Sequence, residues 1–237
     1  MPRERLPNSP LSQVACEVRF TGHFSVIEGL ARFQASVEQE FPSLYVPRVQ
    51  SGDAPALRVS SLAAADDSER INVAIHLFAF VSRKYSVFAE YRTRFFELFG
   101  KFQQIYSPQR FTRFGLRYTN VLPWNTEQAT ATQIHPWLTL GFHVPKVMEQ
   151  RISEVAGILT LCHDQGSLRV SLERRKPEVK AARERLADML VLDLDFFAGD
   201  IQLESLGSTM DEAHRAIEDA FFGVLSSDGL KAMEGSE

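Results

Sequence analysis

Residues 111–122 read FTRFGLRYTNVL, and apolar side chains occupy every second position from Phe114 to Tyr118. Successive side chains of a β-strand point to opposite sides, so this alternation is typical of a strand with one buried face. Arg113 and Arg117 then lie together on the other, polar face. The stretch therefore predicts one strand of an antiparallel sheet that is open on one side.

The chain before this stretch repeats the same kind of pattern. Alternation recurs at Gln13–Phe20 and Ile71–Phe80, and Leu57–Leu62 is a shorter strand candidate. Apolar residues at helical spacing fill Phe24–Phe41 and Phe88–Tyr106. The order strand, helix, strand, strand, helix, strand is that of the split βαβ, or ferredoxin-like, arrangement. We therefore expect residues 1–122 to form a ferredoxin-like α+β half.

The chain after residue 122 follows a less regular pattern. Residues 123–149 contain prolines and short apolar segments, and we interpret them as a linker with local structure. The segments Ile152–Cys162 and Leu168–Arg174 flank a turn signal and predict a β-hairpin, followed by a strand that ends at Phe197 and by a terminal helix. Residues 150–237 are expected to form a second α+β half packed on the first, so the whole chain is expected to be α+β with antiparallel sheets.

Composition and charge limit the kinds of partner. The formal net charge of −4 argues against nucleic acid, which usually requires a basic surface. No apolar run approaches the roughly 20 residues of a membrane-spanning helix, and the polar N-terminus offers no secretory signal. Cys16 and Cys162 lie in apolar segments, where buried, reduced thiols are expected. We therefore expect a cytoplasmic protein with no membrane partner.

The charges are distributed unevenly along the chain. Basic residues outnumber acidic ones between positions 83 and 117, whereas the segment after Asp188 is strongly acidic. Two interpretations are open: the basic segment forms a binding face, or the two segments neutralise each other within the fold or across a dimer. We expect a homodimer.

Charged residues also recur at even spacing within three of the expected strands. Each pair then shares one face of its strand, where the charges need partners if they are even partly buried. The pairs are Glu17 and Arg19, Arg113 and Arg117, and Asp193 and Asp195.

Three interpretations of these pairs are open. Their guanidinium and carboxylate groups can neutralise one another across strands, or simply face water. The arginines can instead line a site for an anionic small ligand or an acidic protein segment, because a guanidinium fork suits carboxylates and phosphates. In the third interpretation, Asp193 and Asp195 hold a divalent cation for phosphoryl chemistry.

The usual catalytic motifs are missing from the sequence, among them the phosphate-binding glycine loops, GxSxG, HExxH and paired CxxC. His76 is the most interesting histidine because it lies within an expected strand, and Glu173 and His163 are weaker candidates. No cofactor or metal is expected. We therefore expect a non-enzymatic ligand- or protein-binding module. The alternative is a metal-dependent hydrolase or nucleotide-handling enzyme that uses Asp193 and Asp195.

A further alternative is an RNA-binding ferredoxin-like domain. It requires exposed aromatic side chains on the central strands, for which Phe78, Phe80 and Tyr118 are available. Packing in the core is the commoner use of such residues, and the net charge also argues against RNA.

Several segments carry a resemblance that spans nearly the whole chain. They are Leu6–Leu11 (LPNSPL), Val18–Phe20 (VRF), Arg113–Asn120 (RFGLRYTN), Leu192–Phe197 (LDLDFF) and Ala216–Asp228. Together they resemble a sporadically distributed, uncharacterised bacterial family of similar length, with N-[AS]-P-[IL] near the start, R-x-G-L-R-Y-x-N in the middle and a late D-x-D-x-F strand. Where the family pattern has an acid two positions after Leu11, this chain has Gln13. The resemblance implies no established activity.

Overall fold

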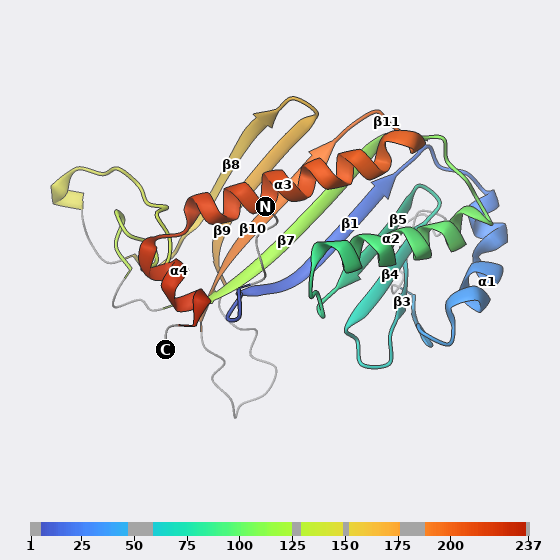
Figure 1. Cartoon of the computed structure of the whole chain (residues 1–237), viewed down its shortest axis with the longest axis horizontal. Coiled ribbons are helices and arrows are strands. Elements are labelled where there is room, and N and C mark those ends of the chain that lie inside the picture. Colours follow the sequence, from blue (N-terminus) through green and yellow to red (C-terminus); the bar gives the residue numbers. More distant parts are fainter. Residues whose placement is uncertain (1–5, 47–58, 125–128, 149–151, 176–187, 236–237) are drawn as a thin grey trace, which may run out of the picture.

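In the residues that the structure describes, nine strands form one antiparallel sheet, and the long helices lie on one of its faces (Figure 1). The computed structural model describes residues 6–46, 59–124, 129–148, 152–175 and 188–235. The strand order is β2-β3-β4-β5-β1-β7-β10-β9-β8, and β6 pairs separately with β11. The elements are β1 (Leu11–Arg19), α1 (Ser25–Val37), β2 (Ser43–Tyr45), β3 (Ser60–Ala63), β4 (Glu69–Ala74), β5 (Leu77–Ser82), α2 (Phe88–Gln103), β6 (Arg110–Phe111), β7 (Arg113–Pro123), η2 (Lys146–Met148), β8 (Ala156–His163), β9 (Gly166–Arg175), β10 (Met189–Ala198), β11 (Ile201–Gln202), η3 (Leu203–Ser205), α3 (Leu206–Val224) and α4 (Ser227–Glu234).

Strand β7 lies inside this sheet, between the strands β2-β3-β4-β5-β1 on one side and β10-β9-β8 on the other. It pairs with β1 on one side, where Val18 is opposite Phe114, and with β10 on the other, where Phe196 is opposite Leu116. Phe114 and Leu116 are fully buried on the helix-covered face, whereas Arg117 is exposed on the open face. The prediction of a strand covered on one side is confirmed, and so is the α+β class with an antiparallel sheet.

The sheet is larger than the arrangement expected from the sequence. A ferredoxin-like unit contains four strands, whereas the first part of this chain contributes β2-β3-β4-β5-β1-β7. Strands β10, β9 and β8 then continue the same sheet beyond β7. The ferredoxin-like assignment and the division into halves at residues 122 and 150 stay predictions.

The expected strand Ile71–Phe80 is wrong, because a turn at Ile75 and His76 divides it into β4 and β5. An uninterrupted strand would place Val73 and Phe78 on opposite faces. The turn instead brings them opposite each other in the ladder, and both are buried in the main core. His76 therefore lies in a turn and not within a strand. The turn contains no Gly, Pro or Asn, so the sequence carries no ordinary turn signal there.

Phe78 occupies the centre of an aromatic cluster between the sheet and the first two helices. Its ring lies within contact of Phe33 on α1 and of Phe95, Phe99 and Phe102 on α2, at centroid distances of 5.1 to 6.2 Å. All of these rings are almost completely buried. The cluster holds α1 and α2 against this part of the sheet. Phe78 is therefore not on an exposed RNA-binding face, and neither is Phe80, which is also completely buried.

Helix α3 covers the other part of the sheet, where it packs along β10 and β7 (Figure 1). The expected hairpin, strand and terminal helix are present as β8–β9, β10 and α3, and the short helix α4 follows. The described part of the expected linker packs beside the end of α3, where the Thr139 N–H donates to the Val224 carbonyl at 2.8 Å. Among the described residues, no helix has the length and apolar character needed to cross a bilayer.

The two cysteines differ in their surroundings. Cys16 on β1 is fully buried, as expected, whereas Cys162 is exposed. The expectation of a buried thiol at Cys162 is wrong because β8, on which it lies, is the last strand of the sheet.

Candidate functional site

Five of the charged residues singled out in the sequence meet on the open face of the sheet. Nη1 of Arg113 lies 2.9 Å from Oε1 of Glu17 on one neighbouring strand, and Nη2 lies 3.4 Å from Oδ2 of Asp195 on the other. Gly115 makes room for this guanidinium, since a Cβ there would lie 2.7 Å from Nη1 of Arg113. We call this set the charged ladder: Glu17, Arg113, Arg117, Asp193 and Asp195.

Arg117 and Asp193 form the second part of the ladder. Nε of Arg117 lies 2.7 and 2.8 Å from the two carboxylate oxygens, and the Thr119 hydroxyl donates to Oδ1 at 3.1 Å. The hydrogen bond with Asp193 raises the pKa of Arg117 above its ordinary value. Arg19, the sixth charged residue singled out in the sequence, lies beside the ladder, where its Nε donates to Oε1 of Glu17 at 2.7 Å.

The remaining candidates do not join the ladder. His76 lies in the β4–β5 turn, and its buried Nδ1 has no hydrogen-bond partner within the described ranges. Glu173 accepts a hydrogen bond from Arg175 at 2.9 Å on the exposed surface. The ring of His163 packs edge-on against Phe196, with the centroids 5.9 Å apart.

These contacts favour neutralisation across the strands. An anionic ligand would have to displace Glu17 from Arg113 or Asp193 from Arg117, and a cation at Asp193 would have to displace Arg117. In the described part of the chain, no group of three His, Cys, Asp or Glu residues is arranged to hold a metal ion. A binding role for the ladder stays a prediction.

Asp195→Asn is expected to leave the melting temperature at pH 7 unchanged or to raise it. Burial raises the pKa of Asp195 above its ordinary value, although Arg113 and Arg117 oppose this shift. Because the folded-state pKa is the higher one, folding favours the protonated carboxyl, and stability is lost as the pH rises through that value. Asparagine imitates the protonated form at every pH.

Thermal melts at pH 4 and pH 7 test this expectation. Asp193→Asn is the matched control, and we expect it to lower the melting temperature because it loses charge-assisted hydrogen bonds from Arg117. A variant at Asp195 that melts well below the wild type at pH 7 would show that its ion pair stabilises the fold.

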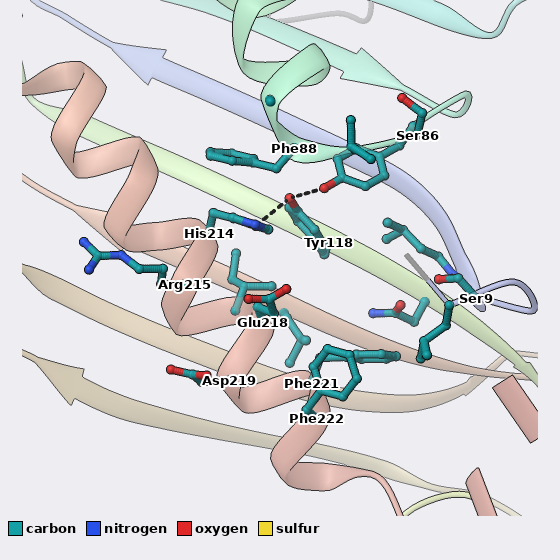
Figure 2. A pocket seen from close by; sticks show the side chains of 18 residues that line it. Ser9, Ser86, Phe88, Tyr118, His214, Arg215, Glu218, Asp219, Phe221 and Phe222 are labelled. Carbon is teal, nitrogen blue, oxygen red and sulfur yellow. Dashed lines mark hydrogen bonds between the residues drawn. The ribbon is translucent and has the colours of Figure 1, made fainter. Parts of the chain in front are cut away.

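A separate cavity lies on the helix-covered face, between the start of α2 and the C-terminal half of α3 (Figure 2). Its volume is about 790 Å³, and β7 and β10 form its floor. We call it the α2–α3 pocket. Most of its lining is apolar and includes Leu6, Leu11, Val87, Phe88, Leu194, Ile217, Phe221 and Phe222.

Tyr118 is the central polar residue of the pocket floor. Its hydroxyl donates to the hydroxyl of Tyr85 at 3.2 Å and is hydrogen-bonded to Nδ1 of His214 at 3.1 Å (Figure 2). Burial raises the pKa of Tyr118 well above its ordinary value, so the phenol stays protonated at neutral pH. Asn120 lies two residues further along β7, and its Nδ2 donates to the Leu192 carbonyl at 3.3 Å.

His214 connects this floor to the wall formed by α2. Its ring stacks on Phe88, with the centroids 3.9 Å apart and the planes inclined by 13°. Burial lowers the pKa of His214 to about 4, although the Asp211 carboxylate opposes the shift. The imidazole is therefore neutral at pH 7, and the polar groups at this point offer hydrogen bonds without a charge.

His214 is expected to titrate with a pKa of about 4 in the folded protein. Because this value is below the ordinary 6.5, the unfolded chain takes up the proton first, and stability is lost as the pH falls from 6.5 toward 4. A histidine-resolved NMR titration measures the pKa directly. This resolution is needed because burial also lowers the pKa of His135, which contributes in the same direction. A His214 pKa near 6.5 would contradict the buried, stacked geometry.

The N-terminal arm and α3 complete the rim. Leu6, Ser9 and Leu11 line the pocket opposite α2, and the arm is tied down where the Asn8 N–H donates to the Met233 carbonyl at 3.0 Å. On α3, His214 and Glu218 point toward β7, whereas Arg215 and Asp219 point away from it (Figure 2). The neutral His214 and the acidic Glu218 thus lie on the β7 side of α3, and Arg215 and Asp219 lie at the outer edge of the pocket.

Sequence reasoning did not find this pocket. It is assembled from five segments that are distant in the chain, and Tyr118 was expected to be a core residue or a base-stacking residue. His214 was not among the candidate residues. One signal was present: His214 is three residues before Ile217 and seven before Phe221, so it continues the apolar stripe of α3. A histidine on such a stripe is either satisfied in the core or directed into a cavity.

Comparison with models of known protein families and with curated proteins finds no match. The resemblance of Arg113–Asn120 and Leu192–Phe197 to an uncharacterised bacterial family therefore stays a prediction.

Proposed function

We propose that this protein is a non-enzymatic binding module that holds a small, mostly apolar and uncharged ligand in the α2–α3 pocket. The observation that carries the proposal is the combination of an apolar cavity with a hydrogen-bonded Tyr118–His214 pair on its floor. A cytoplasmic location stays part of the expectation.

The size and lining of the pocket support a small molecule. Its volume of about 790 Å³ is within the range of roughly 300–1,000 Å³ that is usual for small-molecule sites. Such sites are mainly apolar, with a few polar groups that fix the orientation of the ligand. Tyr118, His214 and Asn120 are suitable groups for that purpose.

The protonation states support an uncharged ligand. Tyr118 keeps its proton because its pKa is raised, and His214 is neutral because its pKa is about 4. A negatively charged group placed against them would lose its hydration without gaining a counter-ion from Tyr118 or His214, which is unfavourable. Glu218 also lines the pocket and points toward β7, and its carboxylate would repel an anion. A neutral hydroxyl, amine or carbonyl would gain hydrogen bonds at no such cost.

Binding is also better supported than catalysis. The polar groups on the floor are hydrogen-bonded to one another, and a histidine with a pKa near 4 is a weak base at neutral pH. In the described residues, Nδ1 of His214 is hydrogen-bonded to the Tyr118 hydroxyl and not to a serine, cysteine or threonine that could act as a nucleophile. The arrangement therefore suits recognition.

Two fluorescent compounds that share one ring skeleton test the proposal. N-phenyl-1-naphthylamine is uncharged, and its sulfonated counterpart 1-anilinonaphthalene-8-sulfonate carries a negative charge. We expect the uncharged compound to bind with a dissociation constant in the micromolar range and the sulfonate to bind more weakly. Equal or tighter binding of the sulfonate would contradict the proposal of an uncharged ligand. If neither compound binds up to its limit of solubility, the proposal that the α2–α3 pocket is a ligand site is contradicted.

A further inference from the structure

We propose that two copies of this chain pair through strand β8, which gives a homodimer with one continuous sheet. Strand β8 is the last strand in the order of the sheet, and within the described residues only β9 pairs with it. In an antiparallel ladder, every second residue of such a strand turns its N–H and C=O groups outward. The free edge of β8 is thus ready to accept another strand.

The side chains of β8 lack the features that normally protect an edge. Its sequence AGILTLCH contains no proline and no Lys, Arg, Asp or Glu, and it is eight residues long. Ile158, Leu159 and Leu161 are 75%, 53% and 40% exposed. Soluble proteins usually shorten or charge their edge strands to prevent pairing with another chain. The opposite edge follows that rule, because β2 is only three residues long and directly follows Pro42.

The strand is complementary to itself, which indicates a second copy as the partner. A two-fold axis through Thr160 would place Leu159 opposite Leu161 of the other copy, and Ile158 opposite Cys162. Apolar side chains then meet apolar side chains on both faces, and no like charges face each other. A symmetric dimer requires a self-complementary patch of this kind, whereas an acidic or basic peptide would find no opposite charge on β8.

Leu159 and Leu161 of β8 lie where a second copy would extend the apolar core on the helix-covered face of the sheet. Leu159 is opposite Val170 and Leu161 is opposite Leu168 in the β8–β9 ladder, and both partners are buried on the helix-covered face. In Figure 1 the β8–β9 hairpin projects past α3, and the apolar side chains of β8 are exposed. A neighbouring β8 would cover the exposed leucines from the side.

Sedimentation velocity measures the assembly of the full chain. We expect a species of twice the chain mass of 26.8 kDa at about 100 µM protein. Ile158→Lys places two positive charges near the axis of the dimer and is expected to give a monomer. Leu44→Lys on β2 is the matched control and should leave the dimer intact, since Leu44 is similarly accessible but lies at the other edge. Circular dichroism and thermal melts verify that both variants remain folded.

Cysteine cross-linking tests the register. Ile158→Cys introduces a thiol directly opposite Cys162 of the other copy, so mild oxidation should give a covalent dimer rapidly. In the wild type, the two Cys162 residues would be roughly 13 Å apart along the strands, too far for a disulfide. Cys16 does not contribute, because it is buried.

The results of these experiments either support or overturn pairing through β8. A dimer that is lost with Ile158→Lys and cross-links with Ile158→Cys supports pairing through β8. A monomer at about 100 µM, a dimer that survives Ile158→Lys, or cross-linking no faster than that of a Leu44→Cys control overturns it. None of these results depends on the α2–α3 pocket.

Discussion

Ala89→Trp is expected to weaken the binding of N-phenyl-1-naphthylamine at least about tenfold, which corresponds to about 1.4 kcal/mol. Ala89 lines the α2–α3 pocket from the first turn of α2, and its side chain is exposed. An indole at this position has no core packing to disturb, and it would occupy space at the pocket wall beside Phe88. The loss of affinity should therefore arise without a loss of stability.

The matched control is Ala35→Trp, which places the same side chain on an exposed position of α1 outside the pocket lining. Fluorescence titrations of the wild type and both variants, with thermal melts to verify folding, give the comparison. We expect wild-type affinity for Ala35→Trp. Equal affinities for the wild type and Ala89→Trp would place the bound compound elsewhere on the protein.

Phe78→Ala is expected to lower the free energy of unfolding by about 3–5 kcal/mol. The side chain is completely buried and is in contact with four other phenylalanine rings from α1 and α2. Its removal deletes ring area and leaves a cavity that the rigid neighbouring rings can fill only partly. Urea denaturation measures the change.

Phe142→Ala makes the same chemical change at a residue that is 49% exposed. We expect it to cost less than about 1 kcal/mol, because surface substitutions rarely cost more. A loss below about 1.5 kcal/mol for Phe78→Ala would mean that the cluster can close around the gap, contrary to the packing described above.

The sequence was most informative where one strand or helix is governed by its own pattern. Alternation at Phe111–Leu122 predicted a strand with one polar face, and the buried Phe114 and exposed Arg117 confirm that face within β7, which begins at Arg113. The prediction of one strand at Ile71–Phe80 from its alternation was wrong, because a tight turn without Gly or Pro reverses the chain there. Period-two patterns before and after such a turn are indistinguishable from one long strand.

The order of the strands in the sheet could not be predicted from the sequence either. No local pattern states that β10 pairs with β7, or that β8 ends the sheet and exposes Cys162. These pairings depend on burial of one common face over the whole sheet, which is a property of the complete fold. The alternation of charges nevertheless predicted which side chains share a face, and Glu17, Arg113 and Asp195 do meet there.

The pocket could not be predicted for a related reason. Tyr118 and His214 come together only because α3 crosses β7, and the cavity lies beside their contact, between the N-terminal arm, the start of α2 and the C-terminal half of α3. Both residues have ordinary structural roles when each is considered alone. Their combination with an apolar wall, and not their residue types, is what indicates a ligand site.

Intermolecular nuclear Overhauser effects between bound N-phenyl-1-naphthylamine and the protein's methyl groups are the most direct measurement of where a ligand binds. Contacts with the methyl groups of Leu11, Leu194 and Ile217, which line the α2–α3 pocket, are the result that we predict. Contacts confined to the exposed side chains of β8, such as Ile158 and Leu161, would contradict the proposed site.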